Sequence, residues 1–183
     1  GGAYDLARAK RAYEKALRVD PKILWGHYQL ARIYFVEGDF NQALEEINEE
    51  LKANPENLRS LYVRGLIYGY RGRVGDLAKA EADFQRFTQW IPGEWGGYND
   101  LAWILAKAGK YEESKNAVLR AFENVPDGKE NPWLWNSLGV AFLNMGKSSE
   151  AKAAFESALQ YAEKLDREEW QKYMSGKTFQ KAQ

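Results

Sequence analysis

The side chains best suited to chemistry are few, and their spacing does not assemble a catalytic or metal site. The 183 residues include one histidine, His27, and no cysteine, which excludes a thiolate nucleophile, a disulfide framework and a cysteine-ligated metal. The carboxylates of Glu45, Glu46, Glu49 and Glu50 are spread around a predicted helix, whereas hard cations need several convergent oxygens. We interpret these glutamates as a solvated outer helix face and His27 as a structural residue.

No sequence motif supplies the rest of an active site. A nucleophile elbow, a phosphate-cradling glycine loop and a zinc-protease helix are all absent from the sequence. We therefore expect a protein that is not an enzyme and that uses neither a cofactor nor a metal ion.

The charge distribution and the lengths of the apolar runs argue against a nucleic-acid partner and against a membrane span. The chain carries 26 basic and 26 acidic residues and has a pI near 6.9, so it does not present the net cationic surface that phosphate contacts require. One local basic cluster, Arg64, Arg71, Arg73 and Lys79, is typical of a solvated helix end. The longest apolar run, Leu101 to Ala106, is far shorter than the roughly 18–20 residues of a membrane span. We expect neither a nucleic-acid partner nor a membrane span.

The composition leaves one unusual feature. Aromatic residues make up 14% of an otherwise polar chain, and seven of them are tryptophan. The absence of cysteine is compatible with the cytoplasm and with the cell exterior, and we favour a soluble cytoplasmic protein.

The elements that position these aromatic residues follow from an internal repeat. Four columns of proline, glycine or small residues recur at intervals of 34 or 37 residues. The columns are Pro21, Pro55, Pro92 and Pro126; Ala31, Gly65, Ala102 and Gly139; Gly38, Gly72, Gly109 and Gly146; and Ala9, Ala43, Ala80, Ser114 and Ala151. Three extra residues account for each longer interval, one set near residues 73–76 and the other within residues 127–132.

Each repeat is predicted to form two helices. Between Pro21 and Gly38 the apolar residues follow a period of 3.6, and Gly38 suits a left-handed helix terminus. Asp39 stands three residues before Gln42, a pattern typical of a capping box at the start of the next helix, and Pro55 prevents continuation of that helix. A two-helix hairpin cannot bury both of its faces alone, so neighbouring hairpins must stack.

These columns resemble the tetratricopeptide repeat (TPR) family over about residues 3 to 162. The matching residues in the last repeat are Trp135, Leu138, Gly139, Phe142, Gly146, Ala151, Phe155 and Ala158. The sequence departs from the family pattern where His27 replaces tryptophan, Arg64 replaces leucine, and Glu50 and Phe87 replace a small residue. The resemblance implies an all-α, right-handed solenoid of antiparallel helix hairpins, with four complete repeats, an N-terminal half-unit and a C-terminal capping helix.

We expect a single solenoid domain over residues 3–174, followed by a flexible tail over 175–183. The expected bounds are 3–20 for the half-unit, 21–55, 56–92, 93–126 and 127–162 for the complete repeats, and 163–174 for the capping helix.

The family resemblance also implies where a ligand binds, because first helices of TPR hairpins line a concave face that holds extended segments. The positions that project inward can be enumerated from the helix phase, and many of them are aromatic. The candidate binding residues are Trp25, Tyr28, Arg32 and Phe35 in the first complete repeat, Tyr62, Leu66 and Tyr70 in the second, Asn99, Trp103 and Lys107 in the third, and Trp133 and Asn136 in the fourth.

Aromatic anchors with a few amides suit a peptide groove, because rings provide contact area at a low entropy cost. For each aromatic residue the alternative is packing against a neighbouring first helix, and for Asn99 and Asn136 it is simple solvation. The cationic set with which one TPR subclass binds a chaperone's terminal carboxylate is absent from the corresponding positions. The sequence thus favours a non-catalytic module that binds a protein or peptide segment.

Self-assembly is the alternative hypothesis. The N-terminal half-unit lacks its partner helix, which implies either a longer native chain or a covered helix face. Stacking against another copy would bury the open end of the solenoid. In that case a charge at Leu6 or Tyr13 would dissociate a homo-oligomer.

Overall fold

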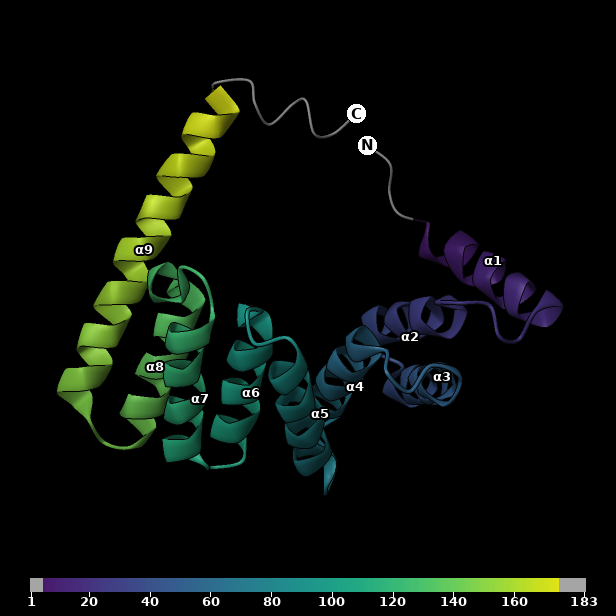
Figure 1. Cartoon of the computed structure of the whole chain (residues 1–183), viewed down its shortest axis with the longest axis horizontal. Coiled ribbons are helices and arrows are strands. Elements are labelled where there is room, and N and C mark those ends of the chain that lie inside the picture. The colour runs from purple at the N-terminus through teal and green to yellow at the C-terminus, as the bar shows by residue number, and fades with distance from the viewer. Residues whose placement is uncertain (1–4, 175–183) are drawn as a thin grey trace. The chain divides into compact units, whose positions relative to one another are not determined.

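The computed structural model describes residues 5–174, with side chains described as far as residue 168, and this part of the chain contains helices and no strand (Figure 1). The predicted tail over 175–183 lies outside the described residues. The elements are α1 (Leu6–Val19), α2 (Gly26–Glu37), α3 (Phe40–Ala53), α4 (Leu58–Arg71), α5 (Asp76–Trp90), α6 (Trp95–Lys107), α7 (Tyr111–Asn124), the 3₁₀ helix η1 (Gly128–Glu130), α8 (Pro132–Asn144) and α9 (Ser148–Met174).

Consecutive helices pair into the hairpins α2–α3, α4–α5, α6–α7 and α8–α9, and α1 packs against α2 as a half-unit. The chain is therefore an all-α helical-repeat solenoid, as predicted. It divides into two compact units, an N-terminal unit that holds α1–α5 and ends at Ile91, and a C-terminal unit that begins at Pro92 and holds α6–α9. The single domain over 3–174 stays a prediction.

The helix ends form where the sequence places them. The Asp39 side chain accepts a hydrogen bond from the backbone N–H of Gln42 at 3.1 Å, which caps α3. Gly38 ends α2 with φ +79°, a left-handed conformation that costs glycine little. Both details confirm the predicted boundary between the two helices of the first hairpin.

The small-residue columns set how closely paired helices approach. A Cβ atom at Gly139 would lie 2.5 Å from the Phe155 ring, and one at Gly65 would lie 2.9 Å from the Phe84 ring. The glycines therefore let each aromatic ring of the second helix rest directly on the backbone of the first. The helix pairs could not keep this spacing with a larger residue in the column.

Each unit has its own apolar core. In the N-terminal unit the core cluster consists of Ala31, Ala43, Leu44, Ile47, Val63 and Ile67. Buried residues of the C-terminal unit are Tyr98, Leu101, Ile104, Val118, Leu134 and Ala141, among others. First and second helices both contribute to these cores, for example Ile67 of α4 and Phe84 of α5, which are each 0% exposed.

The last helix differs from the predicted boundaries. A capping helix was expected over 163–174, separate from the repeat that ends at 162, but α9 continues without a break from Ser148 to Met174. The sequence from Ser148 to Met174 contains no glycine or proline that would end the helix. The extra residues of the two longer intervals form the turn before α5 and the 3₁₀ helix η1.

Among the described residues, no helix combines the length and apolar character that crossing a bilayer requires.

Candidate functional site

Predicted binding residues of the first repeat lie in contact along α2. The Trp25 and Tyr28 rings meet edge to face with their centroids 5.2 Å apart, and the Arg32 guanidinium lies 5.6 Å from the centroid of Tyr28. Phe35 of α2 meets Tyr70 of α4 at 5.4 Å, again edge to face. The contact between Phe35 and Tyr70 joins aromatic side chains of two first helices, α2 and α4.

Trp25 has an unusual backbone conformation. It is the N-cap of α2 with φ +69°, a left-handed conformation that is strained for a bulky residue and costs about 1–3 kcal/mol. Its side chain remains 37% exposed. Together with Leu24, Arg59 and Ile91 it lines a pocket of about 700 Å³ beside the loop between α3 and α4. This conformation presents the indole at the pocket.

The structure places the other predicted residues of α4 differently. Tyr62 packs its ring against Phe84 and Phe87 of α5, with centroid distances of 5.6 and 5.0 Å. Tyr62 therefore contributes to the packing of its own hairpin, whereas the alternative considered for each aromatic residue was packing against a neighbouring first helix. Leu66 is half-buried on the same helix.

In the C-terminal unit, Trp133 stacks on another tryptophan. Its ring lies 5.2 Å from that of Trp95, with an angle of 22° between the planes, and Trp133 remains 52% exposed. Trp133 and Asn136 line a pocket of about 590 Å³ between α8 and α9, with Phe155 and Leu159 on the α9 side. Two predicted residues thus share one largely apolar pocket.

The remaining predicted residues of this unit make polar contacts within it. The carbonyl oxygen of the Asn99 amide accepts a hydrogen bond from the Ser137 hydroxyl at 2.8 Å, and its NH₂ group donates to Asp100 at 3.4 Å. The Lys107 ammonium lies 5.1 Å from the Trp103 ring centroid. The Asn99 amide is therefore engaged by its neighbours, unlike the exposed Asn136.

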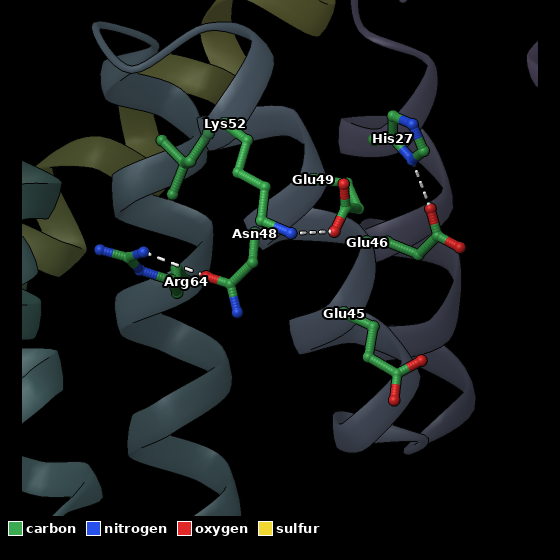
Figure 2. Close-up of a pocket in the computed structure, with 8 residues that line it drawn as sticks. His27, Glu45, Glu46, Asn48, Glu49, Lys52 and Arg64 are labelled. Carbon is green, nitrogen blue, oxygen red and sulfur yellow. Dashed lines mark hydrogen bonds and ion pairs between the residues drawn. The ribbon is translucent and has the colours of Figure 1, made fainter. Parts of the chain in front are cut away.

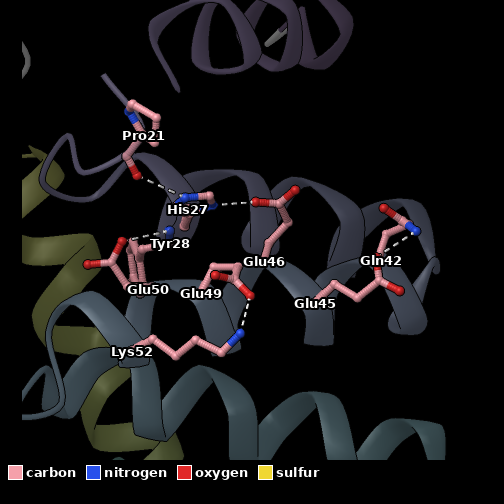
Figure 3. Close-up of polar contacts among 9 residues, drawn as sticks. All are labelled: Pro21, His27, Tyr28, Gln42, Glu45, Glu46, Glu49, Glu50 and Lys52. Carbon is pink, nitrogen blue, oxygen red and sulfur yellow. Dashed lines mark hydrogen bonds and ion pairs between the residues drawn. The ribbon is translucent and has the colours of Figure 1, made fainter. Parts of the chain in front are cut away.

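A polar pocket that the sequence reasoning did not identify lies between α2, α3 and α4 (Figure 2). It encloses about 780 Å³. His27 Nδ1 forms a hydrogen bond with Glu46 Oε2 at 2.7 Å, and Nε2 lies 3.3 Å from the Pro21 carbonyl oxygen (Figure 3). Glu49 pairs with Lys52 at 2.5 Å on the same helix. Hydrogen bonds and an ion pair therefore engage His27, Glu46, Glu49 and Lys52 within this pocket.

Arg64 connects this pocket to the next hairpin. Its guanidinium donates to both carboxylate oxygens of Asp83 at 2.8 and 2.7 Å, and to the Asn48 amide oxygen at 3.1 Å. The hydrogen bonds with Asp83 raise the pKa of Arg64. Arg64 was expected in a solvated basic cluster, which is wrong, because a buried aspartate binds it.

Arg71 makes a similar pair. It donates two hydrogen bonds, both of 2.8 Å, to the carboxylate of Asp76, whose side chain is 1% exposed. The backbone N–H of Arg73 adds a third at 3.0 Å. The hydrogen bonds from Arg71 lower the pKa of Asp76 and raise that of Arg71.

Glu50 also corrects the expected solvated face of α3. Glu45 and Glu49 are exposed, but Glu50 is 1% exposed. Its carboxylate accepts hydrogen bonds from the side-chain amides of Asn54 and Asn57 and, at 3.3 Å, from the backbone N–H of Tyr28. A buried carboxylate with three donors replaces the small residue of the family pattern.

The glutamates of α3 thus point to different partners. In the part of the chain that the structure describes, no group of three or more histidine, aspartate or glutamate side chains is arranged to hold a metal ion.

One sequence model described as tetratricopeptide repeat matches residues 2–64, and a second with the same description matches residues 134–165. The chain belongs to the tetratricopeptide repeat family. TPR proteins are typically non-catalytic interaction scaffolds, and the helix hairpins and small-residue contacts described above are what the family predicts.

Three similar proteins illustrate the range of relatives. The TPR repeat-containing protein PA4667 of Pseudomonas aeruginosa is 28% identical over 163 residues, which cover 85% of this chain and 27% of that protein. A crystal structure of MamA superposes with a TM-score of 0.77 at 22% identity, covering 89% of this chain and 92% of MamA. YrrB, described as a TPR protein with an unusual peptide-binding site, has a TM-score of 0.70 at 20% identity, with coverages of 86% and 78%.

The chain spans about a quarter of the length of the curated relative PA4667. The two solved structures share its fold.

Proposed function

We propose that this TPR chain is a non-catalytic interaction module that binds an extended peptide or protein segment through the first-helix faces of its two units. The observation that carries the proposal is the exposure of large aromatic side chains at the predicted positions. Trp25 is 37% exposed, Tyr70 is 58% exposed and Trp133 is 52% exposed. We expect it to act in the cytoplasm and without nucleic acid.

Exposed aromatic residues support this proposal for an energetic reason. A buried tryptophan or tyrosine provides much of the binding energy of an interface, and it loses little conformational entropy on binding. The two pockets beside Trp25 and Trp133 can each receive an apolar side chain of a ligand. Arg32, Lys107 and Asn136 supply exposed polar groups that can orient the backbone of a bound segment.

The likeness to YrrB agrees with this proposal, since YrrB is a TPR protein with an unusual peptide-binding site. The likeness is one of fold, so the residues of the present chain must be tested directly.

A random peptide display library provides that test, because the selection works with a partner of any sequence. Peptides selected on the wild-type chain are titrated against Trp25→Ala/Tyr70→Ala and against Trp103→Ala/Trp133→Ala. We expect each selected peptide to lose at least about tenfold in affinity for one of these variants, because truncating a central aromatic residue typically costs more than about 1–2 kcal/mol.

Trp90→Ala is the matched control, because Trp90 is 65% exposed but lies on the second helix α5. Selected peptides should bind this variant as they bind the wild type. Equal affinity for all variants of confirmed helicity, or loss of affinity only with Trp90→Ala, would contradict the groove assignment.

Self-assembly through the open N-terminal end is a second candidate. It is favoured by α1, in which no residue is fully buried, so that Leu6 and Tyr13 keep part of their surface accessible. Light scattering over a range of concentrations should then show a dimer that Tyr13→Glu dissociates. A monomer at all concentrations would exclude this candidate.

A further inference from the structure

The outer face of α1 carries a stripe of basic residues. Arg8, Arg11, Lys15 and Arg18 follow one another at intervals of three or four residues, which places them on one side of the helix. All four side chains are exposed. We name these four residues the α1 basic stripe.

The opposite side of α1 is held against α2. Lys10 of α1 forms an ion pair with Glu37 of α2 at 3.0 Å and lies 4.0 Å from the Tyr34 ring centroid. Leu17 packs where α2 begins, so that a Cβ atom at Gly26 would lie 2.9 Å from its side chain. Because α1 is attached by this side, the α1 basic stripe faces away from the packed surface.

The side chains of the stripe take part in no ion pair within the part of the chain that the structure describes. Among the described residues, none pairs with the side chain of Arg8, Arg11, Lys15 or Arg18, whereas Arg64 and Arg71 of the same unit each bind an aspartate. Four cations along about 15 Å of helix therefore create a local positive field in a chain whose formal net charge is zero.

The other second helices show that this pattern does not come from the repeat. The residues that occupy the four stripe positions there are of mixed character. They are Gln42, Glu45, Glu49 and Lys52 in α3, Lys79, Ala82, Arg86 and Gln89 in α5, Glu113, Asn116, Arg120 and Glu123 in α7, and Glu150, Ala153, Ser157 and Gln160 in α9. Only α1 carries a cation at all four, so the charge is a property of this helix.

Exposed apolar side chains continue the stripe at the end of α1. Val19 is 82% exposed and lies one helical turn beyond Lys15, on the same side of the helix. Lys22 and Leu24 follow in the loop, and Leu24 is 61% exposed. Cations next to exposed aliphatic side chains suit the boundary between phospholipid headgroups and acyl chains.

We propose that the α1 basic stripe binds an anionic lipid surface, with Val19 entering the headgroup region. The combination favours lipid over single-stranded nucleic acid, because Val19, the exposed apolar residue on the stripe side of α1, is aliphatic, whereas bases stack on aromatic side chains. The proposal concerns the outer face of α1 and does not depend on the proposed peptide binding by the first-helix faces.

The expected binding is reversible and sensitive to salt. Each lysine or arginine near an anionic membrane contributes a factor of about five to the partition constant. Four cations together contribute a factor of several hundred, which falls as the ionic strength rises. Such affinity positions a protein on a surface for as long as the acidic lipid persists there.

Vesicle co-sedimentation tests the proposal with the whole chain. Vesicles of phosphatidylcholine with about 30% phosphatidylglycerol are compared with vesicles of phosphatidylcholine alone. We expect binding to the acidic vesicles only, with a loss of at least about 30-fold in the variant Arg11→Glu/Lys15→Glu, because two cations are removed. Val19→Ser should weaken binding to a smaller degree, and its effect should persist at high salt.

Arg86→Glu/Lys147→Glu is the matched control, since it changes the net charge by the same amount at two exposed positions outside α1. It should bind the acidic vesicles nearly as the wild type does. Equal losses for both double variants would show that only the net charge matters and would overturn the assignment to α1. Wild-type binding to neutral vesicles at the same level, no binding to either, or tighter binding to an oligonucleotide or an acidic peptide would overturn the lipid proposal.

Discussion

The second helices of the two units differ at one position that faces the first helix. In the N-terminal unit this position holds an acid, Glu46 in α3 and Asp83 in α5, and each binds a basic side chain 19 residues earlier in the chain. In the C-terminal unit the same position holds Ala117 and Ala154, which are 4% and 2% exposed. In the N-terminal unit, a polar pair at this position therefore joins the two helices of each hairpin. In the C-terminal unit, a buried alanine takes its place.

The basic partners stand where the family pattern has apolar residues. His27 replaces the tryptophan and Arg64 replaces the leucine, whereas Leu101 and Leu138 keep the leucine in the C-terminal unit. A departure from the pattern in the first helix is thus matched by a departure in the second. The comparison teaches that an unexpected cation in a repeat should be interpreted together with the residue that faces it.

Introducing only the arginine of the polar pair into the C-terminal unit should cause the largest loss of stability. Leu101 is 3% exposed, and Leu101→Arg would bury a guanidinium in a unit where Ala117 stands at the repeat position of Asp83. We expect a loss of about 3–5 kcal/mol in the free energy of unfolding, as is typical of an uncompensated buried charge. Urea denaturation followed by circular dichroism measures this loss.

The double variant Leu101→Arg/Ala117→Asp transplants the complete pair. It should recover part of the stability lost in Leu101→Arg, with Ala117→Asp alone as the control. A double variant no more stable than Leu101→Arg would show that the polar pair requires more of its N-terminal surroundings than the two facing residues.

Breaking the native pair should have an intermediate effect. Asp83→Ala leaves the partly buried Arg64 guanidinium with only the Asn48 oxygen, and we expect a loss of about 2 kcal/mol. Arg64→Leu/Asp83→Ala restores the arrangement of the C-terminal unit, and it should lie within about 1 kcal/mol of the wild type because no charge is left unpaired. Urea denaturation again measures the free energy of unfolding. A double variant less stable than Asp83→Ala would show that the apolar arrangement of the C-terminal unit cannot replace the polar pair of the N-terminal unit.

A fall in pH should reduce the stability of the N-terminal unit more than that of the C-terminal unit. We expect this effect to be smaller than the losses caused by the substitutions in the polar pair. The pKa of Asp76 is lowered in the folded chain by its hydrogen bonds with Arg71, so the folded state binds fewer protons than the unfolded state. This stabilisation is complete above the ordinary pKa of aspartate and is lost as the pH falls through the lowered value. The pKa of Glu112 in the C-terminal unit is also lowered, by Lys115, but that pair is exposed and screened by solvent.

The variant Asp76→Asn measures the contribution of this carboxylate. It should be less stable than the wild type at about pH 7, and the difference should shrink as the pH falls toward about 3. A difference that stays constant over this range would assign the effect of the variant to packing and not to charge.

The sequence predicted most of the fold because the repeat fixes it through local signals. The capping residue Asp39, the left-handed Gly38 and the close approach at Gly139 each act between neighbouring helices of one hairpin. The continuous α9 was missed because the family pattern suggested a boundary that the residues from Ser148 to Met174 do not enforce.

The candidate site was harder to predict because it depends on side chains from different helices. The helix phase selected Trp25, Tyr70 and Trp133, which are exposed, but it selected Tyr62 equally, although that ring packs on α5. Helical phase gives the direction of a side chain, whereas the space that it finds there depends on the facing helix. The burial of Glu50 was also missed. Its hydrogen-bond donors Asn54 and Asn57 lie beyond the C-terminal end of α3, so the helical phase of α3 alone could not indicate them.

The stacked pair of Trp95 and Trp133 has an optical consequence. Two indoles 5.2 Å apart and nearly parallel are close enough for their electronic transitions to couple, and the pair joins α6 to α8 within the C-terminal unit. Its near-ultraviolet signal should therefore change when that unit opens or when a ligand wedges between the rings, which makes the protein its own spectroscopic probe.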